Sequence, residues 1–284
     1  MDPPVAIALI ALGLALLGAG GEALVRASTT LAELAGVSPA VIGLTVVAIG
    51  TSLPELVVSL VAAFRGEPDL AVANVVGSNI FNLAATLGLT ALIIPLPVHG
   101  SAVRLEWPMM FAASFICLLL ARDGQLDRLE GGFFLVSLVL FIAYTVHLAR
   151  TDVGTAEARQ LEEHVEARDI DVSPGAKRVV GSRLVVTIAV LAVGIAALVT
   201  GGRLLVDGAV SLARIAGMSE RVIGLTIVAG GTGVPELATS LVAAFRQRTD
   251  VAVANMIGSN IFNILGILGV TALIVPVPVA PESI

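Results

Sequence analysis

Long apolar runs separated by short polar segments dominate this 284-residue chain. About 20 apolar residues suffice for a helix to cross the roughly 30 Å hydrocarbon core of a bilayer. Runs of this length, rich in Ala and Leu, favour helices, and the alternating segments of about ten residues that are typical of a membrane barrel are not seen. We therefore predict eight transmembrane helices, near residues 5–26, 40–64, 70–94, 105–121, 131–149, 184–206, 221–245 and 251–275.

One stretch of this pattern occurs twice. Residues 43–95 recur as residues 224–276, without a gap, at a constant offset of 181, and 35 of the 53 positions are identical. Five predicted helices separate the starts of the two copies, so equivalent residues enter the membrane from opposite sides. The sequence therefore predicts an inverted repeat, a frequent plan of secondary transporters, in which the binding site lies where the two copies meet.

The polar segments divide the chain. We predict a first membrane repeat at residues 1–149, a hydrophilic linker at residues 150–183 and a second membrane repeat at residues 184–284. The linker carries seven acidic and six basic side chains. With the N-terminus outside, ten Lys and Arg residues lie on the cytoplasmic side against six outside. The positive-inside rule therefore predicts an outside N-terminus and a cytoplasmic linker.

Composition limits the classes of function. The chain is 57% hydrophobic and 13% charged, and its mean hydropathy is +0.99, so we expect an all-α integral membrane protein surrounded by the lipid bilayer. The net charge of −6 and the lack of a basic stripe argue against nucleic acid as a partner. Cys117 has no partner for a disulfide. An intramembrane enzyme is an alternative from another class, but no His-Glu-x-x-His motif is present.

Each copy contains the motif Gly-Thr-x-x-Pro-Glu. Pro54 and Pro235 cannot donate a helical hydrogen bond, so each is expected to kink its helix and release backbone oxygens in the preceding turn. The next residues are Glu55 and Glu236, although a charge at the centre of a membrane helix costs roughly 2.5 to 3.5 kcal/mol. Two carboxylates with carbonyls and hydroxyls suit a hard divalent cation, and calcium tolerates such flexible cages better than magnesium. A protonated glutamate bonded to a neighbour is the alternative.

Each copy also contains Gly-Ser-Asn-Ile-Phe-Asn, which ends at Asn82 or Asn263. Together the doubled motifs resemble the two alpha repeats of the cation/calcium exchanger superfamily, and the chain is most similar to its short bacterial sodium/calcium antiporters. The resemblance implies an antiporter of the cell (inner) membrane, without a cofactor, in which inward sodium movement drives calcium outward by alternating access. A proton/calcium exchanger and a passive cation channel are the alternatives within transport.

The resemblance also implies the ligands of the transported ions. The implied calcium ligands are Glu55, Glu236 and the backbone carbonyls of Thr51 and Thr232. The implied sodium ligands are the carbonyls of Ala48 and Ala229, the side chains of Thr51, Ser52, Ser78, Thr232 and Ser259, and the same two glutamates. Asn82 and Asn263 are implied to lie at the centre. Because Asn263 is uncharged, potassium cotransport is not expected.

Two features depart from the family pattern. Gly233 stands where the first copy has Ser52, so one hydroxyl of a sodium site is missing, and we expect the change Gly233→Ser to restore it. The first copy is followed by two helices, but the second copy is followed by only eight residues. Of ten family helices the last two are therefore absent, and we expect a partner chain or missing helices to cover helices 221–245 and 251–275.

The inverted repeat further predicts two states that open to opposite sides of the membrane. We expect helices 5–26 and 184–206 to slide over the remaining helices during this change. Their small residues would provide the sliding surface, namely Gly18, Gly20, Gly21, Gly201 and Gly202.

Overall fold

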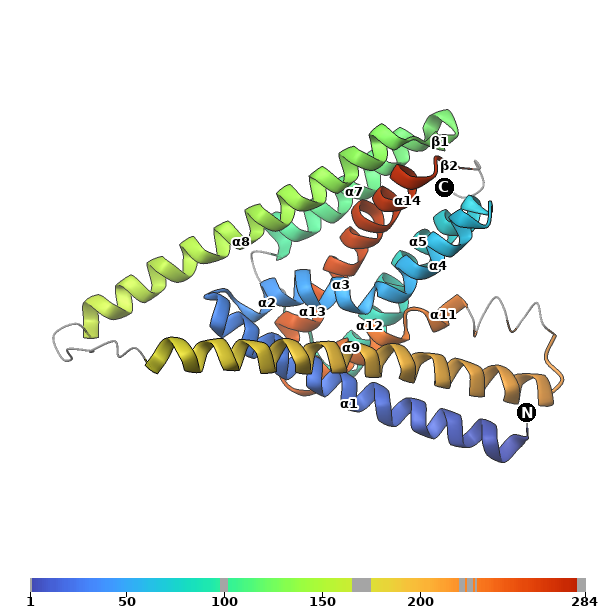
Figure 1. Cartoon of the computed structure of the whole chain (residues 1–284), viewed down its shortest axis with the longest axis horizontal. Helices are drawn as coiled ribbons and strands as arrows, with labels where there is room; N and C mark the ends of the chain where they lie inside the picture. Colours follow the sequence, from blue (N-terminus) through green and yellow to red (C-terminus); the bar gives the residue numbers. More distant parts are fainter. Residues whose placement is uncertain are drawn as a thin grey trace.

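The computed structural model describes residues 2–97, 102–164, 175–219, 223, 227 and 229–279, which are almost entirely helical (Figure 1). The first half comprises α1 (Pro3–Ala35), α2 (Pro39–Ile42), η1 (Gly43–Val47), α3 (Ala48–Thr51), α4 (Leu53–Phe64), α5 (Pro68–Phe81), η2 (Asn82–Leu87), α6 (Gly88–Ile93), η3 (Ala102–Glu106), α7 (Trp107–Leu120), η4 (Ala121–Asp123) and α8 (Arg128–His164). The second half comprises α9 (Gly175–Ile215), α11 (Ala229–Gly231), α12 (Val234–Phe245), α13 (Thr249–Ile261), η6 (Phe262–Leu268) and α14 (Gly269–Ile274). Two short strands, β1 (Gln125–Leu126) and β2 (Val277–Pro278), pair in an antiparallel manner.

The helices fit a multi-pass membrane protein. Within the described residues, six helices are long and apolar enough to span a bilayer, and a pair bent by 44°, Pro39–Thr51 with Leu53–Phe64, makes up to seven. α12 is apolar but shorter. The predicted all-α membrane fold is thus confirmed. The predicted number of eight stays a prediction, because several residues of helix 221–245 lie outside the described part of the chain.

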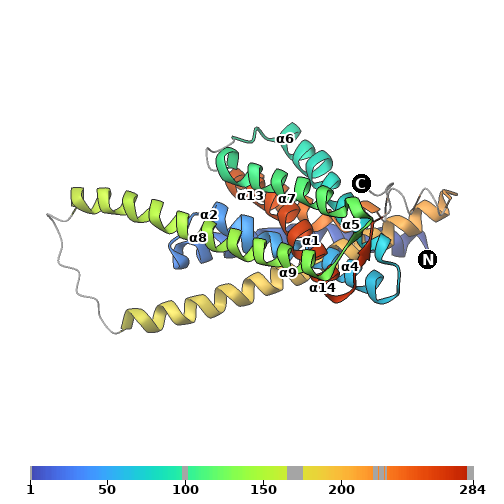
Figure 2. The same ribbon diagram turned by 90° about the horizontal axis from the view of Figure 1, so that it is seen from above.

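Several helices are longer than predicted. α1 continues to Ala35 and ends at Gly36, whose φ of 64° is the left-handed conformation that glycine adopts without strain. α8 continues to His164 and α9 begins at Gly175, so both ends of the predicted linker 150–183 are helical, and residues 165–174 lie outside the described part. Figure 2 shows these two helices extending beyond the other helices at the ends that face the linker.

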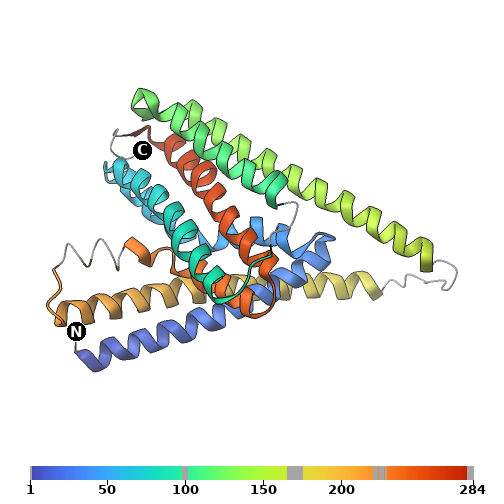
Figure 3. The ribbon, with the colours of Figure 1, turned by 180° about the vertical axis from the view of Figure 1, so that it is seen from behind.

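The equivalent helices α1 and α9 lie side by side and run in opposite directions (Figures 1 and 3). Glycines allow this close approach. A Cβ atom added at Gly13 would lie 2.8 Å from the carbonyl oxygen of Gly201, and one added at Gly208 would lie 2.7 Å from that of Ala6. Small residues let membrane helices approach backbone to backbone in this way. The antiparallel pairing of two equivalent helices is the arrangement that an inverted repeat predicts.

The two copies form the centre of the molecule, but they have different neighbours. α8 packs on η6 and α14, and α7 packs on α13 and η6. As a result, 78% of the apolar window in residues Thr249–Ile274 is buried, against 22% in Leu70–Ile93. The helices that follow the first copy therefore pack on the second copy, whereas the flank formed by α5, η2 and α6 is largely exposed. A partner chain or missing helices against helices 221–245 and 251–275 stay a prediction.

Candidate ion-binding site

A break in the helix positions each glutamate. Ser52 (φ −85°, ψ 9°) separates α3 from α4, and Gly233 (φ −79°, ψ 0°) precedes α12, with a proline in the first turn of each following helix. The predicted interruption is thus present in both copies. The backbone oxygen of Ala48 was predicted to lack a helical hydrogen bond, but it accepts one from the backbone N–H of Ser52 at 3.1 Å. The hydroxyl of Thr51 also donates to this oxygen, at 3.4 Å, so an ion bound there would have to displace or share that weak bond.

The carboxyl groups of Glu55 and Glu236 are each 1% exposed and lie close enough to interact electrostatically. Ser52 Oγ donates to Glu236 Oε1 at 3.0 Å, and the side chain of Thr51 also lies in hydrogen-bonding range of Glu236. Thr232 makes the equivalent interaction with Glu55. Each copy therefore supplies a hydroxyl to the carboxylate of the other copy, and the two breaks form one centre.

A second layer of the centre consists of four asparagines. Asn82 Nδ2 donates to Asn260 Oδ1 at 3.3 Å, and the symmetry-equivalent pair places Asn263 Nδ2 at 3.0 Å from Asn79 Oδ1. The sequence prediction included Asn82 and Asn263 but missed Asn79 and Asn260. Their signal was present, because both belong to the motif that the two copies share letter for letter.

Two further asparagines hold the helical hairpins together. Asn74 Nδ2 donates to Ser59 Oγ at 2.9 Å and to the carbonyl oxygen of Glu55 at 3.0 Å. Asn255 Nδ2 donates to Ser240 Oγ at 3.3 Å in the second copy. These bonds fix the helix that carries each glutamate against the helix that follows it.

Several oxygens at the centre are buried and have no hydrogen-bond partner. These atoms are Glu55 Oε2, Glu236 Oε2, Asn82 Oδ1, Asn263 Oδ1 and Ser259 Oγ. An unsatisfied buried acceptor costs about 1 to 3 kcal/mol. A hard cation such as calcium or sodium would satisfy carboxylate, amide and hydroxyl oxygens together. Among the described residues, no three His, Cys, Asp or Glu side chains are placed to hold one metal ion together, so neutral oxygens would complete any cage around the two carboxylates.

The other predicted ligands lie on the same helices. Ser78 and Ser259, 6% and 0% exposed, lie on α5 and α13, one turn before Asn82 and Asn263. Ala48 begins α3 and is fully buried. Ala229 begins α11, and its side chain is outside the described part of the structure.

A cleft borders the centre on one side, although both glutamates stay buried. A cleft of about 220 Å³ between α4, α9 and α12 is lined by residues that include Thr232, Pro54 and Gly202. Thr51, the equivalent of Thr232, is only 1% exposed. The cleft lies along the half of α9 that packs against the N-terminal half of α1. The cleft therefore lies towards the end of the molecule at which α1 begins.

The space beside Gly233 is not vacant. A Cβ atom added there would lie 2.4 Å from Cδ1 of Phe81. The sequence-based expectation that Gly233→Ser alone restores a sodium-binding hydroxyl is therefore corrected, because the serine side chain would overlap an aromatic ring.

Known proteins share this arrangement. The family model described as sodium/calcium exchanger protein matches residues 5–147 and 186–284, which include both copies and both glutamates. The chain belongs to the sodium/calcium exchanger family. This confirms the resemblance stated from the doubled motifs.

Individual members of the sodium/calcium exchanger family match along most of their length. Inner membrane protein YrbG of Escherichia coli is 40% identical over 97% of this chain and 82% of its own length. Sodium/calcium exchanger MaX1 of Methanosarcina acetivorans is 31% identical over 97% of this chain and 85% of its own. A solved structure of the sodium-calcium exchanger NCX_Mj, soaked with 10 mM Na⁺ and zero Ca²⁺, superposes with a TM-score of 0.79 at 30% identity, covering 99% of this chain and 87% of that one.

Proposed function

We propose that this chain is a secondary antiporter that exchanges Na⁺ for Ca²⁺ by alternating access. The main support for this proposal is the pair of buried carboxylates, one from each copy, whose Oε2 atoms lack a hydrogen-bond partner. Two negative charges match one divalent cation, or sodium ions in its place, and the names of the exchangers that the chain resembles support this pair of ions.

Each ion would use oxygens already placed at the centre. Calcium would be held by Glu55 and Glu236 with the backbone carbonyls of Thr51 and Thr232. Sodium would use the carbonyls of Ala48 and Ala229, the side chains of Thr51, Ser52, Ser78, Thr232 and Ser259, and the same carboxylates. Since both ions need the glutamates, they compete, and this competition couples their movements.

The ion gradients would set the direction of transport, and the orientation of the chain would decide which side the cleft faces. An inner-membrane location with the N-terminus outside and the linker in the cytoplasm would make the cleft at Thr232 an opening to the outside. Sodium entering there would replace calcium at the glutamates, and the inward sodium gradient would drive calcium out. The protein would act as a transporter and not as an enzyme, with transported ions and no resident cofactor. Lipid, a partner chain or further helices would cover the exposed flank at α5 and α6.

Proton/calcium exchange is the nearest alternative, because it can use the same two glutamates. Calcium flux into vesicles that contain the purified protein separates the two. We expect uptake when sodium is loaded inside the vesicles and diluted outside, and no uptake when a pH gradient is the only driving force. Uptake that follows the pH gradient and ignores sodium would contradict the proposal.

A further inference from the structure

The two copies differ at one pair of equivalent places in the cage. In one, Ser52 Oγ donates to Glu236 Oε1 at 3.0 Å. In the other, beside Glu55, Gly233 has no side chain to make this bond. We call these places the Ser52 position and the Gly233 position.

The ring of Phe81 fills the Gly233 position. A Cβ atom added at Gly233 would lie 2.4 Å from Cδ1 and 2.7 Å from Cε1 of Phe81, and one added at Gly230 would lie 3.3 Å from Cε2. Carbon atoms without a bond between them prefer separations of about 3.5 to 4.0 Å. The ring therefore packs against the bare backbone of both glycines and leaves no room for a side chain.

The equivalent ring, that of Phe262, lies elsewhere. A Cβ atom added at Gly266 would lie 2.6 Å from both Cδ2 and Cε2 of Phe262, so this ring covers Gly266. The residue equivalent to Gly266 in the first copy is Ala85, which already has a Cβ atom. Phe81 therefore cannot adopt the placement of Phe262. The other side differs as well, because the residues equivalent to Gly230 and Gly233, against which Phe81 packs, are Ile49 and Ser52, whose side chains occupy the place that Phe262 would need.

We propose that Phe81 removes one of two symmetry-related sodium positions, so that sodium binds at the Ser52 position and not at the Gly233 position. A phenyl ring has no oxygen with which to replace the water around a sodium ion, and it fills the space that a hydroxyl would need. This exchanger consequently moves one sodium ion fewer per calcium ion than a symmetric cage would. The identity of the ion rests on the proposed function, whereas the difference between the two positions rests on the packing of the two rings.

The double variant Ala85→Gly/Gly233→Ser tests this inference. The first change lets Phe81 adopt the placement of Phe262, and the second supplies the missing hydroxyl. We expect one more sodium ion bound per chain, and up to about a tenfold gain in apparent sodium affinity, because a hydrogen-bond-scale contribution corresponds to about one decade in affinity. A second variant, Phe81→Ala/Gly233→Ser, removes the ring outright and should act in the same direction.

One single change serves as the matched control. Ala85→Gly alone opens the space without adding a hydroxyl, so it should leave the number of bound sodium ions unchanged.

Two measurements report the outcome. Equilibrium binding of radioactive sodium to the purified protein counts ions per chain, and the sodium gradient at which net calcium flux stops gives the ratio of the two ions. Double variants that bind calcium normally but keep the wild-type sodium count and ratio would overturn the inference. Absence of sodium-driven flux in the wild type would refute the proposed function instead, and the sodium count would still decide the role of Phe81.

Discussion

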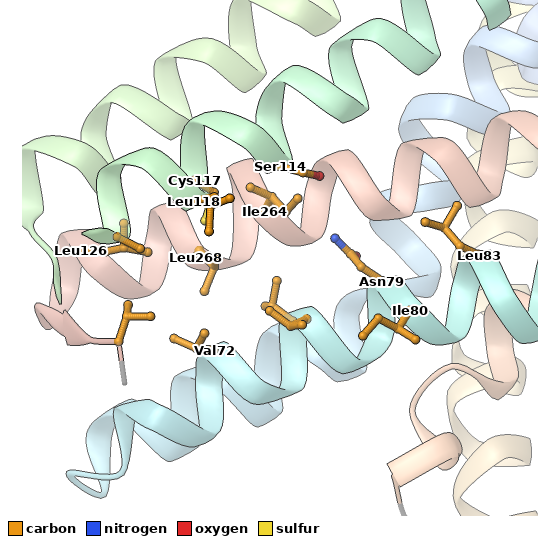
Figure 4. Close-up of a pocket in the computed structure, with 14 residues that line it drawn as sticks. Val72, Asn79, Ile80, Leu83, Ser114, Cys117, Leu118, Leu126, Ile264 and Leu268 are labelled. Carbon is orange, nitrogen blue, oxygen red and sulfur yellow. The ribbon is translucent and has the colours of Figure 1, made fainter. Parts of the chain in front are cut away.

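The two copies have the same residue at 35 of 53 positions, yet they have different surroundings. Helix α13 and the segments that follow it pack on α7 and α8, whereas α5 is separated from α7 and η6 by an apolar pocket of about 210 Å³ (Figure 4). In the figure, Val72 of the first copy and Leu268 of the second lie on opposite sides of this pocket. The sequence of a copy therefore sets its breaks and its polar face, while the rest of the chain decides what covers it.

The two ends of the central cage also differ in charge. Away from the cleft, the partly exposed Glu22 pairs with Arg246 at 2.7 Å and with Arg26. The residues equivalent to Glu22 and Arg246 are Arg203 and Arg65, which carry the same charge. An ion pair thus links α1 to the end of α12 away from the cleft, and the two equivalent residues would repel each other. We infer that this difference favours the conformation described here.

The largest expected effect on calcium exchange concerns the buried glutamate that both copies share. Glu55→Gln and Glu236→Gln should each abolish measurable exchange, because a lost charged ligand corresponds to roughly 10- to 100-fold weaker calcium binding. Calcium flux in vesicles checks this expectation. Glu33→Gln is the matched control, since this exposed glutamate pairs only with Arg183 at 3.3 Å among the interactions described. Normal flux in either cage variant would show that the two carboxylates do not act together.

The next effect concerns the contact between α1 and α9. A Cβ atom at Gly20 would lie 2.8 Å from the carbonyl oxygen of Gly194, and one at Gly201 would lie 2.8 Å from that of Gly13. Gly20→Leu and Gly201→Leu should therefore each lower the free energy of unfolding by about 1 to 3 kcal/mol through overpacking.

Gly18 provides the control for this pair, because a Cβ atom there would have nothing within 4 Å. Gly18→Leu should leave the thermal unfolding midpoint in detergent unchanged. Equal midpoints for Gly18→Leu and Gly20→Leu would mean that the backbones of α1 and α9 do not approach as closely as described.

The smallest effect concerns the ion pair away from the cleft. Exposed pairs contribute about 0.2 to 1 kcal/mol, so Glu22→Gln should lower apparent calcium affinity from the cleft side by less than about fivefold and raise it from the other side. Sided flux measurements in oriented vesicles check the direction. The charge exchange Glu22→Arg/Arg246→Glu should restore part of the difference, because the pair with position 246 is rebuilt while the new arginine faces Arg26. No recovery relative to Glu22→Arg alone would show that Arg246 does not contribute to the effect.

The sequence predicted the chemistry of the site better than its packing. Pro54 and Pro235 break their helices for a local reason, so the breaks and the glutamates beside them could be located from the chain alone. The direction of the Phe81 ring depends on Ala85 in its own copy and on Gly233 in the other. No local pattern contains that combination.

The same limit applies to the glycines of α1 and α9. We expected all of these glycines to face the remaining helices. Gly20 and Gly201 instead lie in the contact between α1 and α9. Gly21 faces α12, because a Cβ atom added at Gly21 would lie 3.0 Å from Val242. Helical spacing places Gly20 and Gly21 about 100° apart, yet it does not say which partner each one meets. The sliding of these two helices stays a prediction, and Gly21 is now the residue of α1 at which to test it.

The central claim is that both copies build one calcium site. Equilibrium binding of radioactive calcium to the purified protein, with increasing sodium, tests it most directly. We expect one calcium ion per chain, displaced by sodium, and none in either Glu55→Gln or Glu236→Gln at the same calcium concentration. Two calcium ions per chain in the wild type, with one remaining in each variant, would show that the copies bind calcium separately and would contradict the claim.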